Sequence, residues 1–231
     1  MKDKFLAVPF AAAAAFILYI LPRFFSMDYY LHIFVMSEIY AVLALSLSLL
    51  VGFTGQVSLG HAAFYGMGAY VSALLSVRFG LSFWVTFWVG GLFAGLAAFC
   101  IGRLVLRLRG HVLAITTAFF GVLVTVVMNN WIPVTNGPMG ITGIPRPSPI
   151  RLFGLDLAIE SRTDYYYLGL LFVLGVLYVL WRIERSRIGD AMIAVRENEE
   201  LAKSIGIDTM KSKVFAFSVS GGLTGLAGAF Y

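Results

Sequence analysis

The residues that could do chemistry gather in one stretch, Gly52–His61, which lies between two long apolar runs. Its members are glycines and short polar side chains, namely Gly52, Thr54, Gly55, Gln56, Ser58, Gly60 and His61. Glycine costs about 1 kcal/mol relative to alanine inside a helix, so the cluster predicts a break in helical structure. In a membrane, non-helical backbone is tolerated only where protein buries it or where it lines a water-filled cavity. The stretch is therefore either the lining of a substrate passage or an ordinary loop between two spanning helices.

Enzymatic and metal chemistry find little support in these residues. Ser58 and His61 are three residues apart and could share a helix face, but no third group completes a triad and no G-x-S-x-G elbow occurs. Three scattered histidines and one cysteine offer no metal-ligand spacing. The chain also lacks a G-x-x-x-x-G-K-[ST] loop for ATP. We predict no catalytic residue, metal, cofactor or nucleic-acid partner.

The elements that position this stretch are apolar helices. The chain is 60% hydrophobic and 13% charged, whereas soluble domains carry about 25% charged residues. A run of about 20 apolar residues crosses a bilayer core. The sequence therefore predicts an all-α, polytopic transmembrane bundle, one domain over residues 1–231. The seven predicted membrane segments are 5–22, 31–51, 62–77, 81–102, 111–128, 164–181 and 214–231. The first is longer than the apolar part of a signal peptide, which has about 7–15 residues, so we interpret it as a span.

The distribution of positive charge predicts the orientation. If the N-terminus lies in the cytoplasm, 12 of the 17 lysines and arginines fall on the cytoplasmic side, as the positive-inside rule requires. Residues 129–163, rich in proline and glycine, then form an irregular external loop, and the charged residues 182–213 form a cytoplasmic segment. The charges disfavour one broken crossing at Gly52–His61, but they are compatible with a re-entrant dip there. Within the predicted spans, His32 and Glu38 form no chain suited to proton coupling, which weighs against an ion-driven carrier.

The cytoplasmic segment carries an amphipathic pattern that predicts one helix over Ile188–Ile205. The apolar positions recur at helical spacing and are Ile188, Met192, Val195, Ala202 and Ile205. Gly206 is the expected helix stop. Such a helix either lies in the membrane surface or docks on a partner. Because acidic residues nearly balance basic ones in this segment, we favour docking.

Four segments resemble one known family. The string T-G-Q-V-S-L-G-H-A-A-F-Y-G-M-G-A-Y, ending at Tyr70, resembles the signature of the permease subunits of branched-chain amino acid ABC importers, the LivM/LivH family. Asn136–Pro145 resembles the outer loop of the M-type subunit. Arg187–Ile207 resembles the cytoplasmic segment that meets the ATPase, and Lys213–Tyr231 resembles the helix after it. The resemblance runs from about Tyr40 to the last residue. Family members continue with further helices, so we expect a C-terminally truncated chain.

The resemblance implies a permease subunit in the cytoplasmic (inner) membrane that translocates leucine, isoleucine and valine. The implied partners are a second permease subunit, two cytoplasmic ATP-binding subunits, an external solute-binding protein and the lipid bilayer. ATP hydrolysis would then lie on a separate subunit, so this chain would not be an enzyme. A permease for urea or short amides is the alternative within the family. An ion-coupled carrier, a membrane enzyme or a structural membrane subunit are alternatives of other classes.

Three groups of site residues follow as expectations. Gly52–His61 would line or gate the passage, with Gln56 and Ser58 contacting the charged ends of an amino acid. The residues expected to couple to the ATPase are Ile188, Gly189, Ala191, Ala194, Arg196, Glu197, Asn198 and Gly206. The residues expected to dock the binding protein are Asn136, Gly137, Gly140, Thr142 and Gly143. The alternatives are an interfacial helix for the second group and a plain connecting loop for the third.

Overall fold

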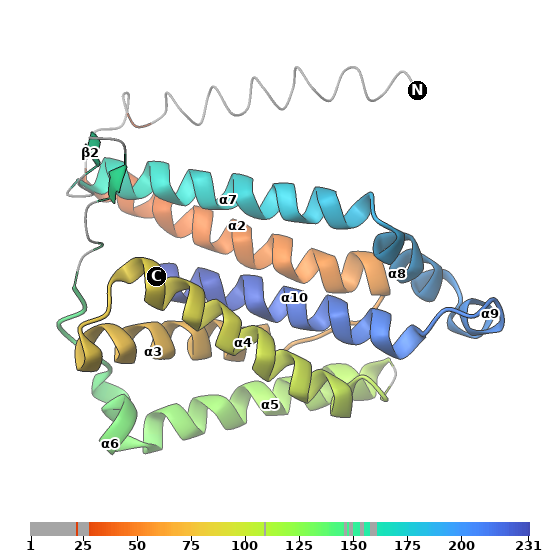
Figure 1. The fold of residues 1–231 in the computed structure, drawn as a ribbon. Coiled ribbons are helices and arrows are strands. Elements are labelled where there is room, and N and C mark those ends of the chain that lie inside the picture. Colours follow the sequence, from red (N-terminus) through yellow and green to blue (C-terminus); the bar gives the residue numbers. More distant parts are fainter. Residues whose placement is uncertain are drawn as a thin grey trace.

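A computed structural model describes residues 22, 28–108, 110–145, 147, 150–152, 155–157 and 161–231. These residues form a bundle of roughly parallel and antiparallel helices (Figure 1), which confirms the all-helical prediction. The long helices are α2 (Asp28–Thr54), α3 (His61–Phe79), α4 (Phe83–Val105), α5 (His111–Asn130), α7 (Arg162–Glu184) and α10 (Thr209–Phe230). The short ones are α6 (Ile132–Thr135), η1 (Gly137–Met139), α8 (Arg187–Glu197) and α9 (Glu199–Ser204).

Five described helices are long and apolar enough to cross a membrane: α2, α4, α5, α7 and α10. They match five of the predicted runs. The run 62–77 corresponds to α3, a 19-residue helix that is not among these five. The run 5–22 lies outside the described residues apart from position 22, so the total of seven stays a prediction.

The two ends of the bundle differ. One end carries α8 and α9, and the other carries α6, η1 and a small hairpin (Figure 1). The hairpin pairs β1 (Ile150–Leu152) with antiparallel β2 (Leu155–Leu157). The segment 129–163 is thus less irregular than predicted, because it contains α6, η1 and this hairpin. The start of α7 at this end is fixed by a capping box, in which the Asp164 N–H donates to Ser161 Oγ and the Ser161 N–H donates to Asp164 Oδ2.

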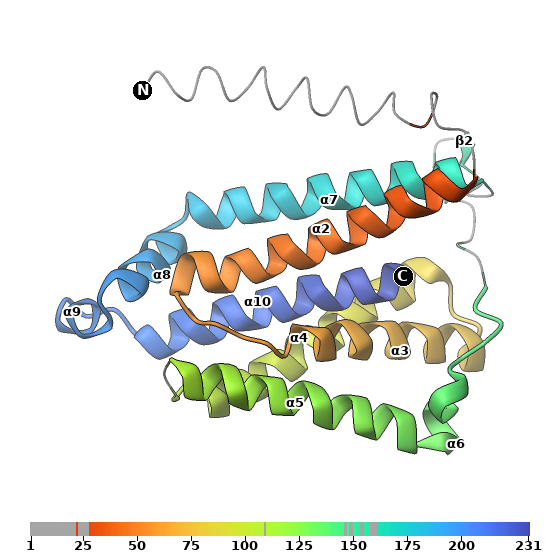
Figure 2. The ribbon, with the colours of Figure 1, turned by 180° about the vertical axis from the view of Figure 1, so that it is seen from behind.

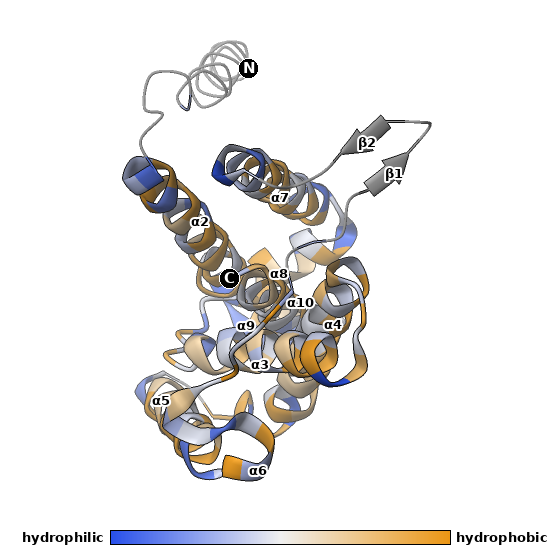
Figure 3. Ribbon diagram, turned by 90° about the vertical axis from the view of Figure 1, so that its left-hand side faces the viewer, coloured by the Kyte–Doolittle hydropathy of each residue, from blue (hydrophilic) through white to orange (hydrophobic). Residues whose placement is uncertain are grey.

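Helix α10 lies at the centre of the bundle, between α2 and α7 on one side and α3 and α4 on the other (Figures 1 and 3). In the most apolar 18-residue stretch of α10, 72% of the residues are buried, whereas 17% are buried in the corresponding stretch of α5. Small residues allow this close packing. A Cβ at Gly225 would collide with the Ala94 methyl group, and one at Gly68 would collide with the Gly225 backbone.

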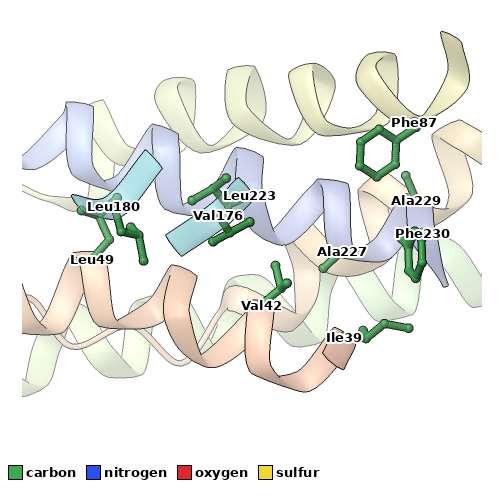
Figure 4. Packing of buried hydrophobic residues seen from close by; sticks show 10 residues of the cluster. All are labelled: Ile39, Val42, Leu49, Phe87, Val176, Leu180, Leu223, Ala227, Ala229 and Phe230. Carbon is green, nitrogen blue, oxygen red and sulfur yellow. The ribbon is translucent and has the colours of Figure 1, made fainter. Parts of the chain in front are cut away.

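Larger apolar side chains fill the space between α10 and its neighbours. Figure 4 shows Val42 of α2 and Val176 of α7 directed toward Leu223 of α10, with Phe87 of α4 near Phe230. In contrast, α4 also carries an exposed apolar row, composed of Trp88, Leu92, Leu96 and Phe99. Such a row is expected on a helix that faces lipid or another subunit.

Candidate translocation and coupling site

The chain between α2 and α3 folds back into the bundle instead of remaining at its end (Figure 2). After Thr54 the chain reaches α5, where the Leu59 N–H donates to Thr117 Oγ1 at 3.0 Å. His61 Nε2 then lies 2.7 Å from Ser220 Oγ in α10. The Ser220 hydroxyl donates to the Ser46 carbonyl, which lies eight residues, or about 12 Å, before the end of α2. Residues 55–60, hereafter the re-entrant segment, therefore return to the interior, and α3 begins there.

A chain of buried polar side chains holds the re-entrant segment in place. Ser58 Oγ lies 3.2 Å from His61 Nδ1, and Ser46 Oγ lies 2.8 Å from Thr224 Oγ1. Because the single Ser220 proton goes to the Ser46 carbonyl, His61 must donate through Nε2 and accept from Ser58 through Nδ1. All five side chains are buried, where an unpaired polar group would be costly. These hydrogen-bonded side chains thus join α2, α3 and α10 at one point.

The sequence analysis found Ser58 and His61 but missed their partners. Ser46, Ser220 and Thr224 lie inside apolar runs, where a hydroxyl can also donate to a backbone carbonyl of the preceding helical turn. Serine or threonine on an otherwise apolar helix was the available signal, but it does not identify the partner helix.

The residues around the re-entrant segment differ in exposure, because some are buried in the bundle and others lie at its surface. Thr54, Ser58 and Gly60 are buried, whereas Val57 and Leu59 are 48% and 64% exposed. Gly52 and Gly55 are also exposed. Gln56 is half-buried, and its Nε2 donates to the Thr54 carbonyl at 3.3 Å. The hydroxyl of Ser58 and the amide of Gln56 are therefore engaged within the chain.

Two glycines are required by close approach. A Cβ at Gly60 would collide with the Thr117 carbonyl of α5. Gly55 has φ +68°, a left-handed conformation that favours glycine, and a Cβ there would lie 3.1 Å from Arg196 Cγ. A Cβ at Gly52, by contrast, would meet nothing within 4 Å.

The predicted cytoplasmic helix is two helices, so the prediction of one helix over Ile188–Ile205 was wrong. Asn198 has extended backbone, and its Oδ1 accepts from the Glu200 and Leu201 N–H groups at 3.0 Å each. This N-cap starts α9 and outweighs the continuous apolar periodicity. The stop at Gly206 is confirmed, since Gly206 has φ +88° and the Ile207 N–H bonds back to the Ala202 carbonyl.

The apolar stripe of this segment is only partly buried. Met192, Val195 and Ala202 are buried, but Ile188 and Ile205 are 46% and 67% exposed. Ala191 and Ala194 are half-buried. Gly189 allows the tight turn from α7, because a Cβ there would collide with the Ile183 carbonyl.

Arg196 points back to the end of α2, next to the re-entrant segment. Its Nη1 donates to the Gly52 carbonyl at 2.6 Å, while Nε and Nη2 donate to Glu197 Oε1. The sequence analysis assigned the turn Arg196–Asn198 to a contact with a partner. In the structure Arg196 and Asn198 make hydrogen bonds within the chain, and Glu197 is more exposed than Arg196. The contact with a partner stays a prediction.

At the opposite end, the predicted docking residues form an ordered turn. Asn136 has φ +63°, and its Nδ2 donates to the Gly140 carbonyl at 2.9 Å. Gly137 is buried in this turn, whereas Thr142 and Gly143 are exposed. Gly137, Gly140 and Gly143 all have positive φ. Arg78 Nη2 ties the turn to α3 by donating to the Pro133 and Val134 carbonyls. Met139 lies at its surface and is 82% exposed.

Comparison with known proteins gives a consistent set of matches. Residues 29–231 match the family described as "Branched-chain amino acid transport system / permease component". The chain is 37% identical over 214 residues to the "High-affinity branched-chain amino acid transport system permease protein LivM" of Escherichia coli K12, covering 85% of this chain and 50% of that protein. The protein of the same description from Salmonella typhimurium is 36% identical over 217 residues, with the same coverage of both chains.

A more distant match is the "Ribose import permease protein RbsC" of Escherichia coli K12, 24% identical over 213 residues and covering 90% of this chain and 62% of that protein. No solved structure matches. The chain spans about half the length of the LivM relatives that it matches.

Proposed function

The chain belongs to the permease family of branched-chain amino acid transport systems, and from this premise we propose that it is a membrane-spanning subunit of an ATP-driven importer of leucine, isoleucine and valine in the cytoplasmic (inner) membrane. The observation that carries the proposal is the similarity to LivM over 85% of the chain. ATP hydrolysis would occur on two separate cytoplasmic subunits. A second permease subunit and an external solute-binding protein would complete the assembly.

The re-entrant segment is the proposed wall of the solute passage. Its backbone is not helical, yet it lies inside a bundle of membrane-spanning helices with Val57 and Leu59 exposed. Lipid cannot form hydrogen bonds with the N–H and C=O groups of such backbone, so water or another protein surface must cover it. A passage between this segment and the second permease subunit provides both. Gln56 and Ser58 would contact the charged ends of the amino acid after exchanging their present hydrogen bonds.

The end that carries α8 and α9 is the proposed cytoplasmic end. Together with the predicted crossing by residues 5–22, this orientation would put the N-terminus in the cytoplasm as well. The described basic residues support this orientation. Those at the α8 end are Arg103, Arg107, Arg182, Arg185, Arg187, Arg196, Lys203, Lys211 and Lys213, whereas Arg78, Arg151 and Arg162 lie at the other end. The exposed apolar side chains on α8 and α9, namely Ile188, Leu201 and Ile205, offer a surface for an ATPase subunit.

The turn around Asn136–Gly140 is the proposed docking point for the solute-binding protein. It lies at the end opposite α8, its backbone is fixed by the Asn136–Gly140 bond, and Met139 projects from it. A fixed turn loses little conformational freedom on binding, which favours its use as a contact.

The test is uptake by the assembled transporter. The full-length protein, its second permease and its ATPase subunits would be reconstituted in liposomes with the loaded binding protein outside. We expect ATP-dependent uptake of labelled leucine that unlabelled isoleucine and valine inhibit and that ribose and urea do not. Uptake of ribose or urea in place of leucine would contradict the proposed substrate, and uptake without ATP would contradict the proposed class.

A further inference from the structure

A lysine is buried where α10 begins. The Lys213 side chain is only 3% exposed, and its Nζ lies 2.8 Å from Glu199 Oε2 of α9. An ammonium group is buried in a protein only when it is paired, because the loss of its hydration is otherwise too costly. The pair Glu199–Lys213 therefore fixes α9 against the first turns of α10.

Helix α9 is short, and little of its surface is buried. It has six residues, of which Ala202 is buried and Leu201 is exposed. The Glu199 carboxylate also accepts from Thr209 Oγ1 at 3.2 Å and lies 3.2 Å from Lys203 Nζ. Glu199 thus joins α9 to two buried residues of α10, Thr209 and Lys213.

Helix α10 leads from this ion pair to the re-entrant segment. Ser220 lies seven residues, or about 10 Å, beyond Lys213 and bonds to His61, at one end of the segment. At the other end, Arg196 of α8 packs on Gly55, the first residue of the segment, and bonds to the Gly52 carbonyl in the last turn of α2. The α8–α9 segment therefore reaches both ends of the re-entrant segment, through Arg196 and through Glu199, Lys213 and α10.

We propose that Glu199 and Lys213 are positioning residues that make α10 move with α9, so that nucleotide-driven movement of α8 and α9 displaces the re-entrant segment at both ends. This inference rests on the proposed function, since it assumes an ATPase subunit at α8 and α9. Arg196 alone would move only the Gly55 end. The ion pair supplies the movement at the His61 end.

The test uses the full-length protein in its assembled transporter. Spin labels on Leu59→Cys in the re-entrant segment and Leu104→Cys in α4, both exposed positions, would be placed in a Cys100→Ser background. The distance between the labels would be measured without nucleotide and with ATP. We expect a nucleotide-dependent shift in the parent protein, its loss in Glu199→Gln, and its return in the charge-reversed pair Glu199→Lys with Lys213→Glu.

The matched control is Glu200→Gln, which removes an exposed carboxylate from the same helix and should keep the shift. A parent-like shift in Glu199→Gln would overturn the inference, as would a parent protein without a shift. If Glu199→Gln fails to assemble, the charge-reversed pair decides: assembly with the shift supports the inference, whereas assembly without it, or no assembly, overturns it. Because the shift is measured independently of the solute carried, a shift without leucine uptake would refute only the proposed substrate.

Discussion

Replacing Gly60 with alanine is the sharpest test of whether the position of the re-entrant segment matters. Gly60 has φ −94°, which any residue can adopt, so the substitution acts through space alone. The new Cβ would lie 3.1 Å from the Thr117 carbonyl carbon and closer still to its oxygen, so this carbonyl would have to retreat by about 1 Å to reach an ordinary contact. The opposing groups are backbone, which cannot rotate away as a side chain can.

The expected cost follows from two contributions. Overpacking of this kind costs about 1–3 kcal/mol. Separating the segment from α5 also threatens the hydrogen bond from Leu59 to Thr117, worth about 0.5–1.5 kcal/mol. Because about 1.4 kcal/mol corresponds to a factor of ten in an equilibrium, the native position of the segment should lose at least tenfold in population. Leucine uptake should fall by a similar factor.

The assay is initial uptake of labelled leucine by cells that depend on this transporter, normalised to the permease in the membrane by immunoblot. Gly175→Ala in α7, outside the proposed sites, is the matched control, since its Cβ would meet nothing within 4 Å and alanine favours a helix interior. It should transport at the parent rate. Parent-like uptake by Gly60→Ala at parent-like abundance would refute the reasoning, because the segment would then tolerate displacement from α5.

Three further predictions concern other parts of the bundle. Ser220→Ala should lower the free energy of unfolding in detergent by about 1–2 kcal/mol, because it leaves buried polar partners unpaired. The Ser218 hydroxyl bonds within its own helix, so an effect no larger than that of Ser218→Ala would contradict this prediction. The hydrogen bond from the Lys211 N–H holds the pKa of the Asp208 carboxyl below its usual range. This cap therefore stabilises the protein at pH values above the usual pKa of an aspartate, and the stabilisation is lost as the pH falls through the lowered pKa. The difference in thermal midpoint between the parent and Asp208→Ala should therefore narrow on acidification, and a widening would refute the cap. A cysteine at Met139 should cross-link to the binding protein in the full assembly, and no adduct there or at neighbouring exposed positions would favour a plain connecting loop.

The sequence alone determined which parts of the chain are helices that can span a membrane. Long apolar runs specify α2, α4, α5, α7 and α10, because length and hydropathy are local properties. The glycines and polar residues of Gly52–His61 specified a break, and the family followed from strings of adjacent residues. Gly206 also ended its helix as predicted, since a left-handed residue after a helix is a local signal.

Local patterns competed in the cytoplasmic segment, and there the sequence misled. The apolar spacing of Ile188–Ile205 indicated one helix, but the side chain of Asn198 satisfies two backbone N–H groups and starts a new one. The Arg196 guanidinium also donates to the Gly52 carbonyl, 144 positions earlier, a contact that no local pattern indicates.

Only the tertiary structure decided how deep the re-entrant segment lies and what holds it. Its partners are distant in sequence: Thr117 is 58 positions from Leu59, Ser220 is 159 from His61, and Thr224 is 178 from Ser46. Each of these hydroxyls can equally satisfy itself on its own helix, so no local preference specifies the pairing. The packing of α10 against α2, α3 and α4 through small residues brings them within hydrogen-bonding distance, and that close approach is a property of the assembled bundle.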